Sequence, residues 1–260
     1  MENNTVLFEK KGQVGVITLN RPDRYNAANT VLVKELLEVL DHVKDNDDIR
    51  AVVITGAGKG FCAGADMAEF GMVSPEEGRD YLINNYQPLM QKITTMPKPV
   101  IAAVNGTGAG VGASLALACD FRVMSERSGI LFAFINVGLG PDGGGSWLLA
   151  RQIGYSKALE YAIEGKKIDG ETCSELGLCN KLVNNDRILS TAIDWATALA
   201  KRPTLAIGIT KLDMQFALNN DLESTIAFEA HQQVAAFSSH DHKEGVAAFI
   251  QKRVPKYIGK

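Results

Sequence analysis

The sequence predicts an α/β fold in which a core of alternating strands and helices is followed by a helical C-terminal region. Three apolar segments, VITLNRP, VVITGAG and VIAAVNGTG, each have the form of a strand that ends in a turn rich in Gly, Asn or Pro. Helical patterns separate these segments, and from about residue 156 onward only helical patterns occur. No low-complexity linker divides the chain, so we expect one domain with a core over residues 1–200 and a helical extension over residues 201–260.

The first elements follow from apolar spacing and turn signals. Residues 14–19 form a β-rich run that ends at Asn20-Arg21-Pro22-Asp23. Apolar residues at helical spacing predict an amphipathic helix over about residues 30–45, and residues 51–55 predict a second strand. Ser74-Pro75-Glu76-Glu77 combines an N-cap serine, a proline at the first helical position and a capping-box glutamate, so a helix begins there and runs to about residue 93.

The remaining elements complete the core and the extension. Met96-Pro97-Lys98-Pro99 ends the preceding helix, and residues 100–104 predict a third strand before Asn105-Gly106. The helices that we expect after the core turns cover residues 157–164, 170–176, 187–201, 204–219 and 222–238.

Composition limits the classes of function. The formal net charge of −3 is unlike the basic surface of a nucleic-acid-binding protein. No apolar run approaches the ~18 residues that a membrane span needs, and the N-terminus lacks the apolar stretch of a secretory signal. The four cysteines form no CxxC pair, which is typical of reduced, packed thiols. We therefore expect a cytoplasmic protein that binds neither nucleic acid nor membrane.

The sequence offers no resident cofactor or metal site. The stretch GTGAGVG has Val111 where the dinucleotide-binding pattern needs its third glycine. No histidine lies between residues 43 and 230, where the glycine-rich turns fall, so a Ser–His hydrolase or a histidine-ligated metal is not expected in the core. His240-Asp241-His242 is expected to be a solvated loop rather than a metal site.

Two turns rich in small residues have a different potential use. FCAGADMAEF, residues 61–70, places small residues before a segment that is compatible with a helix. NGTGAGVGAS, residues 105–114, likewise leads into a small-residue segment. Free backbone N–H groups at such turns stabilise a developing oxyanion. Two converging amides are what a carbonyl oxygen needs in order to become an enolate, although spacing alone does not establish that these two converge.

Four motifs occur in order along the chain, FCAGAD at 61–66, KPVIAAVNG at 98–106, LALACD at 115–120 and GLGPDGG at 138–144. In these motifs the chain resembles the crotonase (enoyl-CoA hydratase/isomerase) superfamily, nearly end to end. The resemblance implies a crotonase-like (ClpP/crotonase) superhelix of repeated ββα turns, C-terminal helices that build homotrimers or dimers of trimers, and an acyl-CoA substrate that itself carries the coenzyme A. It also implies an oxyanion hole made by the amides of Ala65 and Val111.

Departures from the family pattern indicate the reaction. Hydratases of this family use two glutamates, and the corresponding positions hold Ser114 and Phe134, neither of which exchanges protons at neutral pH. Asp142 remains, and the chain is most similar to members that keep an aspartate there, the epoxyphenylacetyl-CoA isomerases of phenylacetate catabolism and some enoyl-CoA isomerases. One carboxylate suffices for a 1,3-proton shift beside a thioester, and an apolar setting would raise its pKa. We expect an isomerase that moves a double bond or expands an epoxide ring, with Asp142 as the catalytic carboxylate.

The resemblance suggests further contacts with the substrate. Residues expected to bind CoA or the acyl group are Arg24, Ala63, Asp66, Met67, Phe134 and, from a neighbouring subunit, Lys252. Apolar residues expected around Asp142 are Phe132, Phe134, Ile135, Val137 and Trp147.

Rival functions are a dehalogenase, a hydratase and a binding protein. A hydrolytic dehalogenase needs a histidine that the core lacks. A hydratase whose acid has moved could use Asp142 with Glu69, so this function stays open. A non-catalytic acyl-CoA-binding scaffold also stays open, and it would not exchange α-protons of its ligand into deuterated water.

Overall fold

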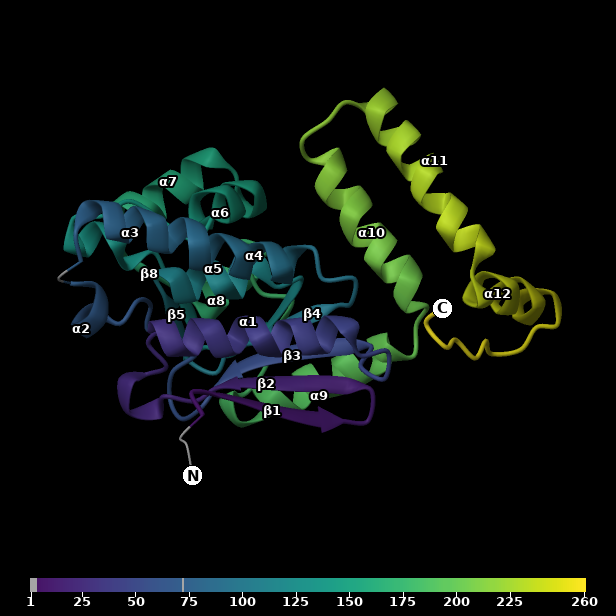
Figure 1. Cartoon of the computed structure of the whole chain (residues 1–260), viewed down its shortest axis with the longest axis horizontal. Helices are drawn as coiled ribbons and strands as arrows, with labels where there is room; N and C mark the ends of the chain where they lie inside the picture. Colours follow the sequence, from purple (N-terminus) through teal and green to yellow (C-terminus); the bar gives the residue numbers. More distant parts are fainter. Residues whose placement is uncertain (1–3, 72) are drawn as a thin grey trace.

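A computed structural model describes residues 4–71 and 73–260 and contains two sheets, the helices that cover them and a helical arm (Figure 1). The larger sheet has the strand order β1-β2-β3-β4-β6-β9, antiparallel between β1 and β2 and parallel thereafter. The smaller sheet has the order β5-β7-β8. The strands are β1 Val6–Lys11, β2 Val14–Leu19, β3 Ala51–Gly56, β4 Val100–Ala103, β5 Thr107–Ala109, β6 Phe121–Met124, β7 Gly129–Leu131, β8 Lys167–Asp169 and β9 Lys181–Leu182.

Both faces of the larger sheet are buried, so its inner strands are apolar at almost every position. Val52 and Ile54 of β3 face the main core, whereas Ala51 and Val53 face a second, smaller core that α9 covers. This alternation explains why the three strand segments read as continuous apolar runs. The helices are α1 Thr30–Asp45, α2 Met67–Phe70, α3 Pro75–Tyr81, α4 Gln87–Thr94, α5 Val111–Ala118, α6 Gly145–Ile153, α7 Tyr155–Glu164, α8 Gly170–Glu175, α9 Ile188–Ala200, α10 Thr204–Ala217, α11 Leu222–Ser238 and α12 His240–Ile250, with short turns η1 Pro22–Arg24, η3 Ala133–Val137 and η4 Asn185–Arg187.

The helix that was expected from residue 74 to about 93 contains a widened turn. Ser74 and Glu77 form the predicted capping box at the start of α3. Between α3 and α4 the chain makes a π-helical turn, η2 Leu82–Tyr86, in which the Gln87 N–H donates to the Leu82 carbonyl. Pro88 follows directly; it has no N–H, and its ring crowds the carbonyl one turn earlier, so a local widening relieves the conflict.

Two expectations for the C-terminal half are wrong. The region after residue 156 is not purely helical, because β8 pairs with β7 and β9 pairs with β6. These strands are two or three residues long, too short to produce a periodic signal. His240-Asp241-His242 is not a solvated loop but the first turn of α12, in which Asp241 is 2% exposed and accepts hydrogen bonds from the amides of Ile258 and Gly259, both at 2.7 Å.

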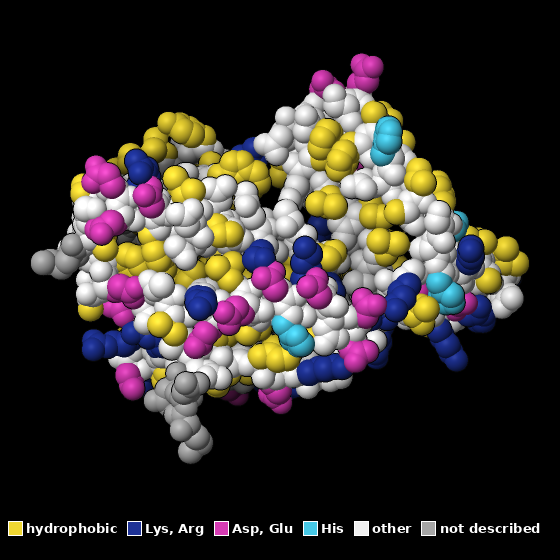
Figure 2. Space-filling model, in the orientation of Figure 1, with side chains coloured by type: hydrophobic (Ala, Val, Ile, Leu, Met, Phe, Trp, Pro, Cys, Tyr) yellow, Lys and Arg dark blue, Asp and Glu magenta, His cyan; other side chains and the backbone are white. Residues whose placement is uncertain are grey.

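Helices α10, α11 and α12 form an arm that stands apart from the sheets (Figure 1). At its base the Lys211 ammonium lies 2.7 Å from the Asp120 carboxylate, and Arg50 donates to the carbonyl oxygens of Tyr257 and Arg202. The rest of the arm exposes many apolar side chains, as Figure 2 shows. These include Met214, Leu218, Leu222, Ile226, Val234, Phe237, Phe249, Ile250 and Val254. Among the helices that the structure describes, none combines the length and apolar character that crossing a membrane requires.

Candidate active site

The two small-residue turns lie side by side in the structure. Cys62 and Gly108 form a parallel bridge, in which the Ala109 N–H donates to the Cys62 carbonyl at 2.9 Å. Gly64 has φ +101°, and a Cβ there would lie 3.0 Å from the Ala109 carbonyl oxygen, so glycine permits the close approach. The backbone pairing therefore brings together the turns that spacing alone did not connect.

The amides of Ala65 and Val111 are both free at this junction. The Gly64 carbonyl and the Asp66 N–H pair with Ala28 at 2.7 and 3.0 Å, and successive amides of an extended segment point to opposite sides, so the Ala65 N–H points away from Ala28. Val111 is the first residue of α5, where amides have no partner within the helix and the helix dipole is positive. Neither amide donates a hydrogen bond within the described part of the chain. Both are available to an oxyanion.

The turn that carries Asp142 is attached to the start of α5. The Ser114 hydroxyl donates to the Asp142 carbonyl at 2.9 Å, and the Gly145 N–H donates to the same oxygen at 2.9 Å. Gly143 has φ +56°, and a Cβ there would lie 3.2 Å from the Val111 side chain. Ser114, at the position of the family's first glutamate, thus ties the backbone of Asp142 to α5, the helix that begins at Val111.

The Asp142 carboxyl group is mostly buried, and its Oδ1 has no hydrogen-bond partner. Burial raises its pKa from 3.8 to about 6. The apolar surroundings differ in part from the expectation. Phe132 and Phe134 are buried, but Ile135, Val137 and Trp147 are 45%, 59% and 42% exposed. These three lie on η3 and α6, and Ile135 and Trp147 line an apolar cavity there.

Sequence reasoning missed Tyr86, the last residue of the π-helical turn. Its side chain is 2% exposed, its hydroxyl has no hydrogen-bond partner, and its ring centroid lies 5.2 Å from that of Tyr81. Burial raises the pKa of Tyr86, and the neighbouring charges of Tyr81 and Asp142 raise it further. The available signal was Pro88 inside a helical pattern, because a proline perturbs a helix and π-helical turns are frequent at functional sites.

The residues expected at the CoA side gather around the start of α2. Asp66 is the N-cap of α2, and the exposed Met67 is its first residue. Arg21, which was not predicted as a site residue, lies 2.8 Å from the Asp66 carboxylate and holds its pKa below the usual value. Arg24 is exposed on η1, near enough for its charge to lower the pKa of Asp66 slightly. Ala63 is exposed, and its amide donates to the Tyr25 carbonyl at 2.9 Å.

Three other candidate residues have distinct placements. Phe134 is buried on η3, and a Cβ at Gly110 would lie 3.8 Å from its ring, so it adjoins the second turn. Glu69 accepts hydrogen bonds from both the amide and the hydroxyl of Thr30, at the start of α1. Lys252 follows α12, which lies on the opposite side of the molecule from α2 (Figure 1).

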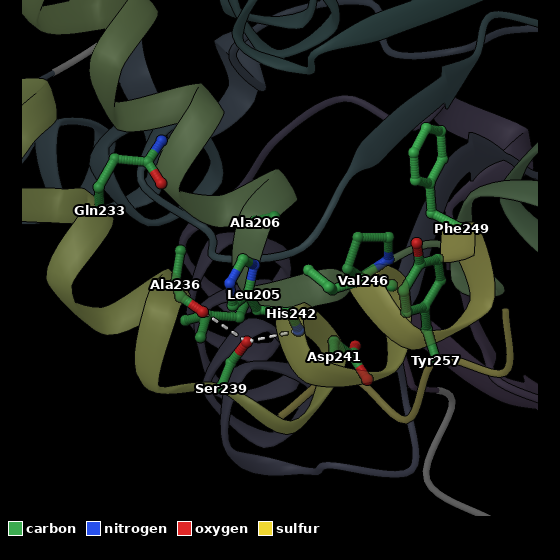
Figure 3. A pocket seen from close by; sticks show the side chains of 12 residues that line it. Leu205, Ala206, Gln233, Ala236, Ser239, Asp241, His242, Val246, Phe249 and Tyr257 are labelled. Atoms are coloured by element: carbon green, nitrogen blue, oxygen red, sulfur yellow. Dashed lines mark hydrogen bonds between the residues drawn. The ribbon is translucent and has the colours of Figure 1, made fainter. Parts of the chain in front are cut away.

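Cavities lie at both ends of the molecule. An apolar cavity of about 530 Å³ lies between η3, α6 and α7, and its lining includes Phe132 and Pro141, next to Asp142. Another, of about 410 Å³, lies in the arm and is shown in Figure 3, where Phe249 and Tyr257 close one side and Ser239 joins Ala236 to His242. Among residues 4–71 and 73–260, no three His, Cys, Asp or Glu side chains are arranged to hold a metal ion.

Comparison with known proteins gives matches over the full length. The family model described as enoyl-CoA hydratase/isomerase matches residues 9–260. The chain is 38% identical to the 1,2-epoxyphenylacetyl-CoA isomerase of Escherichia coli K12, covering 98% of each chain, and 33% identical to the short-chain-enoyl-CoA hydratase of Clostridium acetobutylicum, covering 97% of each. A crystal structure from Geobacillus kaustophilus, titled enoyl-CoA hydratase subunit I, superposes with a TM-score of 0.94 at 33% identity, covering both chains fully. The expected fold and family resemblance are thereby confirmed.

Proposed function

We propose an activity from the premise that this chain belongs to the enoyl-CoA hydratase/isomerase family, whose members act on acyl-CoA thioesters. The proposed reaction is isomerisation beside the thioester, in which one carboxylate moves a proton and two backbone amides stabilise the enolate. The relatives include both an isomerase and hydratases, so the reaction must be argued from the site.

The observation that supports the proposal is the attachment of the Asp142 turn to α5, whose first amide is free, together with the lack of a carboxylate at Ser114 and Phe134. Syn-hydration needs one group to activate water and another to deliver a proton. The Ser114 hydroxyl donates a hydrogen bond to the Asp142 carbonyl oxygen, and Phe134 has no ionisable group. Glu69, the rival acid, already accepts hydrogen bonds from Thr30. A double-bond shift requires a single group that removes a proton and returns it elsewhere, and this favours the isomerase.

The mechanism follows from the contacts of the site. The thioester oxygen would accept hydrogen bonds from the amides of Ala65 and Val111, which stabilises negative charge as the enolate forms. Asp142, ionised at neutral pH, would remove a proton from the α-carbon, next to the thioester carbonyl. It would then return the proton to the γ-carbon, at the far end of the double bond. A pKa of about 6 keeps the carboxylate available as a base and lets its protonated form act as an acid.

The rest of the substrate would extend in two directions. CoA would lie along the start of α2, with contacts to Ala63, Asp66 and Met67, and Arg24 would meet a phosphate. The acyl group would pass Phe134. Because the substrate brings its own coenzyme A, the proposed chemistry uses no resident cofactor or metal. Both 1,3-double-bond shift and epoxide ring expansion begin at such an enolate-stabilising site.

The test is an assay of Asp142→Asn against wild type with 3-enoyl-CoA, 2-enoyl-CoA and an aryl-epoxide CoA. We expect isomerisation to fall by at least about 10²-fold, the lower range for acid–base catalysis. Asp213→Asn is a matched control, because Asp213 also has an unpartnered Oδ1 but lies on α10. Hydration of 2-enoyl-CoA that survives Asp142→Asn would favour the hydratase, and CoA-ester binding without any turnover would favour the scaffold.

We also propose that the arm packs against a second copy of this chain, in a trimer or a dimer of trimers. Its helices expose many large apolar side chains, including Phe249 at 85% and Ile250 at 73%, and gathered apolar side chains on a surface mark interaction sites. A groove of about 570 Å³ between α10 and the sheet, lined by Phe121, Ile207 and Met214, is open to receive part of a neighbour. In such an assembly Lys252 would reach the CoA of the adjacent subunit.

Light scattering after size-exclusion chromatography tests this assembly. The expected mass is three or six times 28.0 kDa, and Phe249→Asp should reduce it. Leu7→Asp is the control, because Leu7 is also an exposed apolar residue but lies on β1. A wild-type mass of one chain would contradict the proposed assembly.

A further inference from the structure

A few buried polar atoms of this protein have no hydrogen-bond partner. Burying a hydroxyl or carboxyl without a hydrogen bond costs about 1–3 kcal/mol, and such atoms in a folded protein call for an explanation. Within the described residues, the buried side-chain atoms without a partner are Tyr81 Oη, Tyr86 Oη, Asp142 Oδ1 and Asp213 Oδ1. Two of these belong to Tyr86 and to Asp142, the candidate catalytic carboxylate.

Tyr86 lies on the side of α4 that meets the Asp142 turn. It precedes Met90 by one helical turn, so the two side chains lie on the same face of the helix. A Cβ at Gly143, the residue after Asp142, would lie 3.2 Å from the Met90 side chain. The charge of Asp142 also acts on the Tyr86 phenol, although no hydrogen bond joins the two residues. An acyl group bound beside Asp142 would therefore pass along this face of α4.

The protein's own packing does not account for the hydroxyl. Tyr86 is part of the main apolar core with Leu89 and Met90, where phenylalanine would supply the same ring without an unpaired oxygen. It is the last residue of the π-helical turn, a rare element that is frequent at functional sites. Tyr81, the adjacent tyrosine, is less buried and its hydroxyl lies near Thr30 and Glu69, although no hydrogen bond of acceptable geometry joins it to Thr30.

We propose that Tyr86 is a specificity-determining residue whose hydroxyl donates a hydrogen bond to an oxygen atom on the acyl group. The favoured substrate class is therefore an acyl-CoA with an ether, epoxide or hydroxyl oxygen near the reacting carbons, rather than a plain hydrocarbon chain. The inference rests on the proposed function, because it takes the space between Asp142 and the two amides as the acyl site. A site with an unpaired donor binds an acyl group that lacks the acceptor less well.

The first experiment measures binding, so that it does not depend on turnover. Affinities for a 3-hydroxyacyl-CoA and for the saturated acyl-CoA of the same length are measured by calorimetry with wild type, Tyr86→Phe and Tyr81→Phe. We expect wild type to prefer the hydroxylated ester and Tyr86→Phe to lose about 10- to 100-fold of that preference, the range for one hydrogen bond in a dry site. Tyr81→Phe should keep it. A wild type without the preference, or a preference that survives Tyr86→Phe, would overturn the inference.

The second experiment compares turnover. The ratio of kcat/KM for an aryl-epoxide CoA to that for a 3-enoyl-CoA should fall by about 10- to 100-fold in Tyr86→Phe. An equal loss with both substrates would contradict a specificity role. The Asp142→Asn assay tests the proposed function alone. The proposed function and the role of Tyr86 can therefore fail separately.

The Tm of Tyr86→Phe distinguishes a binding role from a purely structural one. Because the hydroxyl has no partner, its removal should leave the Tm equal or slightly higher. A clear fall in Tm would mean that the hydroxyl has a structural partner in the folded protein and would count against the inference.

Discussion

The buried carboxyl of Asp142 has a predictable effect on stability. Burial raises its pKa from 3.8 to about 6 in the folded protein. Over the pH range between these values, the folded state binds a proton that the unfolded state has released. The free energy of unfolding therefore falls as the pH rises through this range, and it levels off above about pH 6.

The size of this effect follows from the two pKa values. At about 1.4 kcal/mol per pH unit, the difference between 3.8 and about 6 corresponds to about 3 kcal/mol of destabilisation by the ionised group. Asp142→Asn removes the charge and keeps the shape. We expect the variant to be more stable than wild type by about 2–3 kcal/mol at pH 8, with a difference that shrinks below pH 6 and disappears near pH 4.

Urea denaturation of both proteins from pH 4 to pH 8, at one protein concentration, measures this difference. A constant concentration matters because assembly would contribute to the apparent stability. Asp213→Asn serves as the control on the arm. The reasoning is refuted if Asp142→Asn is less stable than wild type at pH 8, or if its advantage is the same at every pH.

Further predictions concern the parts that hold the site. Ser114→Ala removes the hydrogen bond to the Asp142 carbonyl; we expect a loss of about 1 kcal/mol in stability and a fall in kcat larger than the change in KM, measured by denaturation and steady-state kinetics. Arg21→Ala leaves the Asp66 carboxylate without its 2.8 Å partner at the start of α2; we expect a higher KM for CoA esters with partial recovery in Arg21→Lys, and an unchanged KM would contradict the role of this surface. Asp241→Ala removes the acceptor of the Ile258 and Gly259 amides, so we expect a lower Tm in thermal denaturation. A Tm within about one degree of wild type would show that this carboxylate does not secure the C-terminal tail.

The sequence predicted the long helices and three strands of the larger sheet, but not β1 or β6 of that sheet. Residues 14–19, 51–55 and 100–104 all lie in the larger sheet, where burial on both faces makes them uniformly apolar. Strands β8 and β9 were missed because two or three residues carry no period. The burial of Asp241 was missed because its partners are backbone amides of the tail, about 17 residues farther along the chain.

The sequence predicted which residue types form the candidate site, but not which of them lie close together. Glycine-rich turns before α2 and α5 indicated free amides, whereas their adjacency depends on the Cys62–Gly108 bridge between distant segments. Ser114 was recognised as a departure from the family pattern, but its hydrogen bond to the Asp142 carbonyl follows only from the fold. The partial exposure of Trp147 likewise depends on how α6 packs, which local sequence does not specify.

The central claim is that Asp142 removes a proton beside a thioester whose oxygen the amides of Ala65 and Val111 hold. Exchange of the α-protons of an acyl-CoA in deuterated water, followed by NMR, tests this step without requiring the full reaction. We predict that wild-type protein incorporates deuterium at the α-carbon and that Asp142→Asn does so at least about 10²-fold more slowly. Exchange at the same rate in both proteins, or none in wild type, would contradict the account.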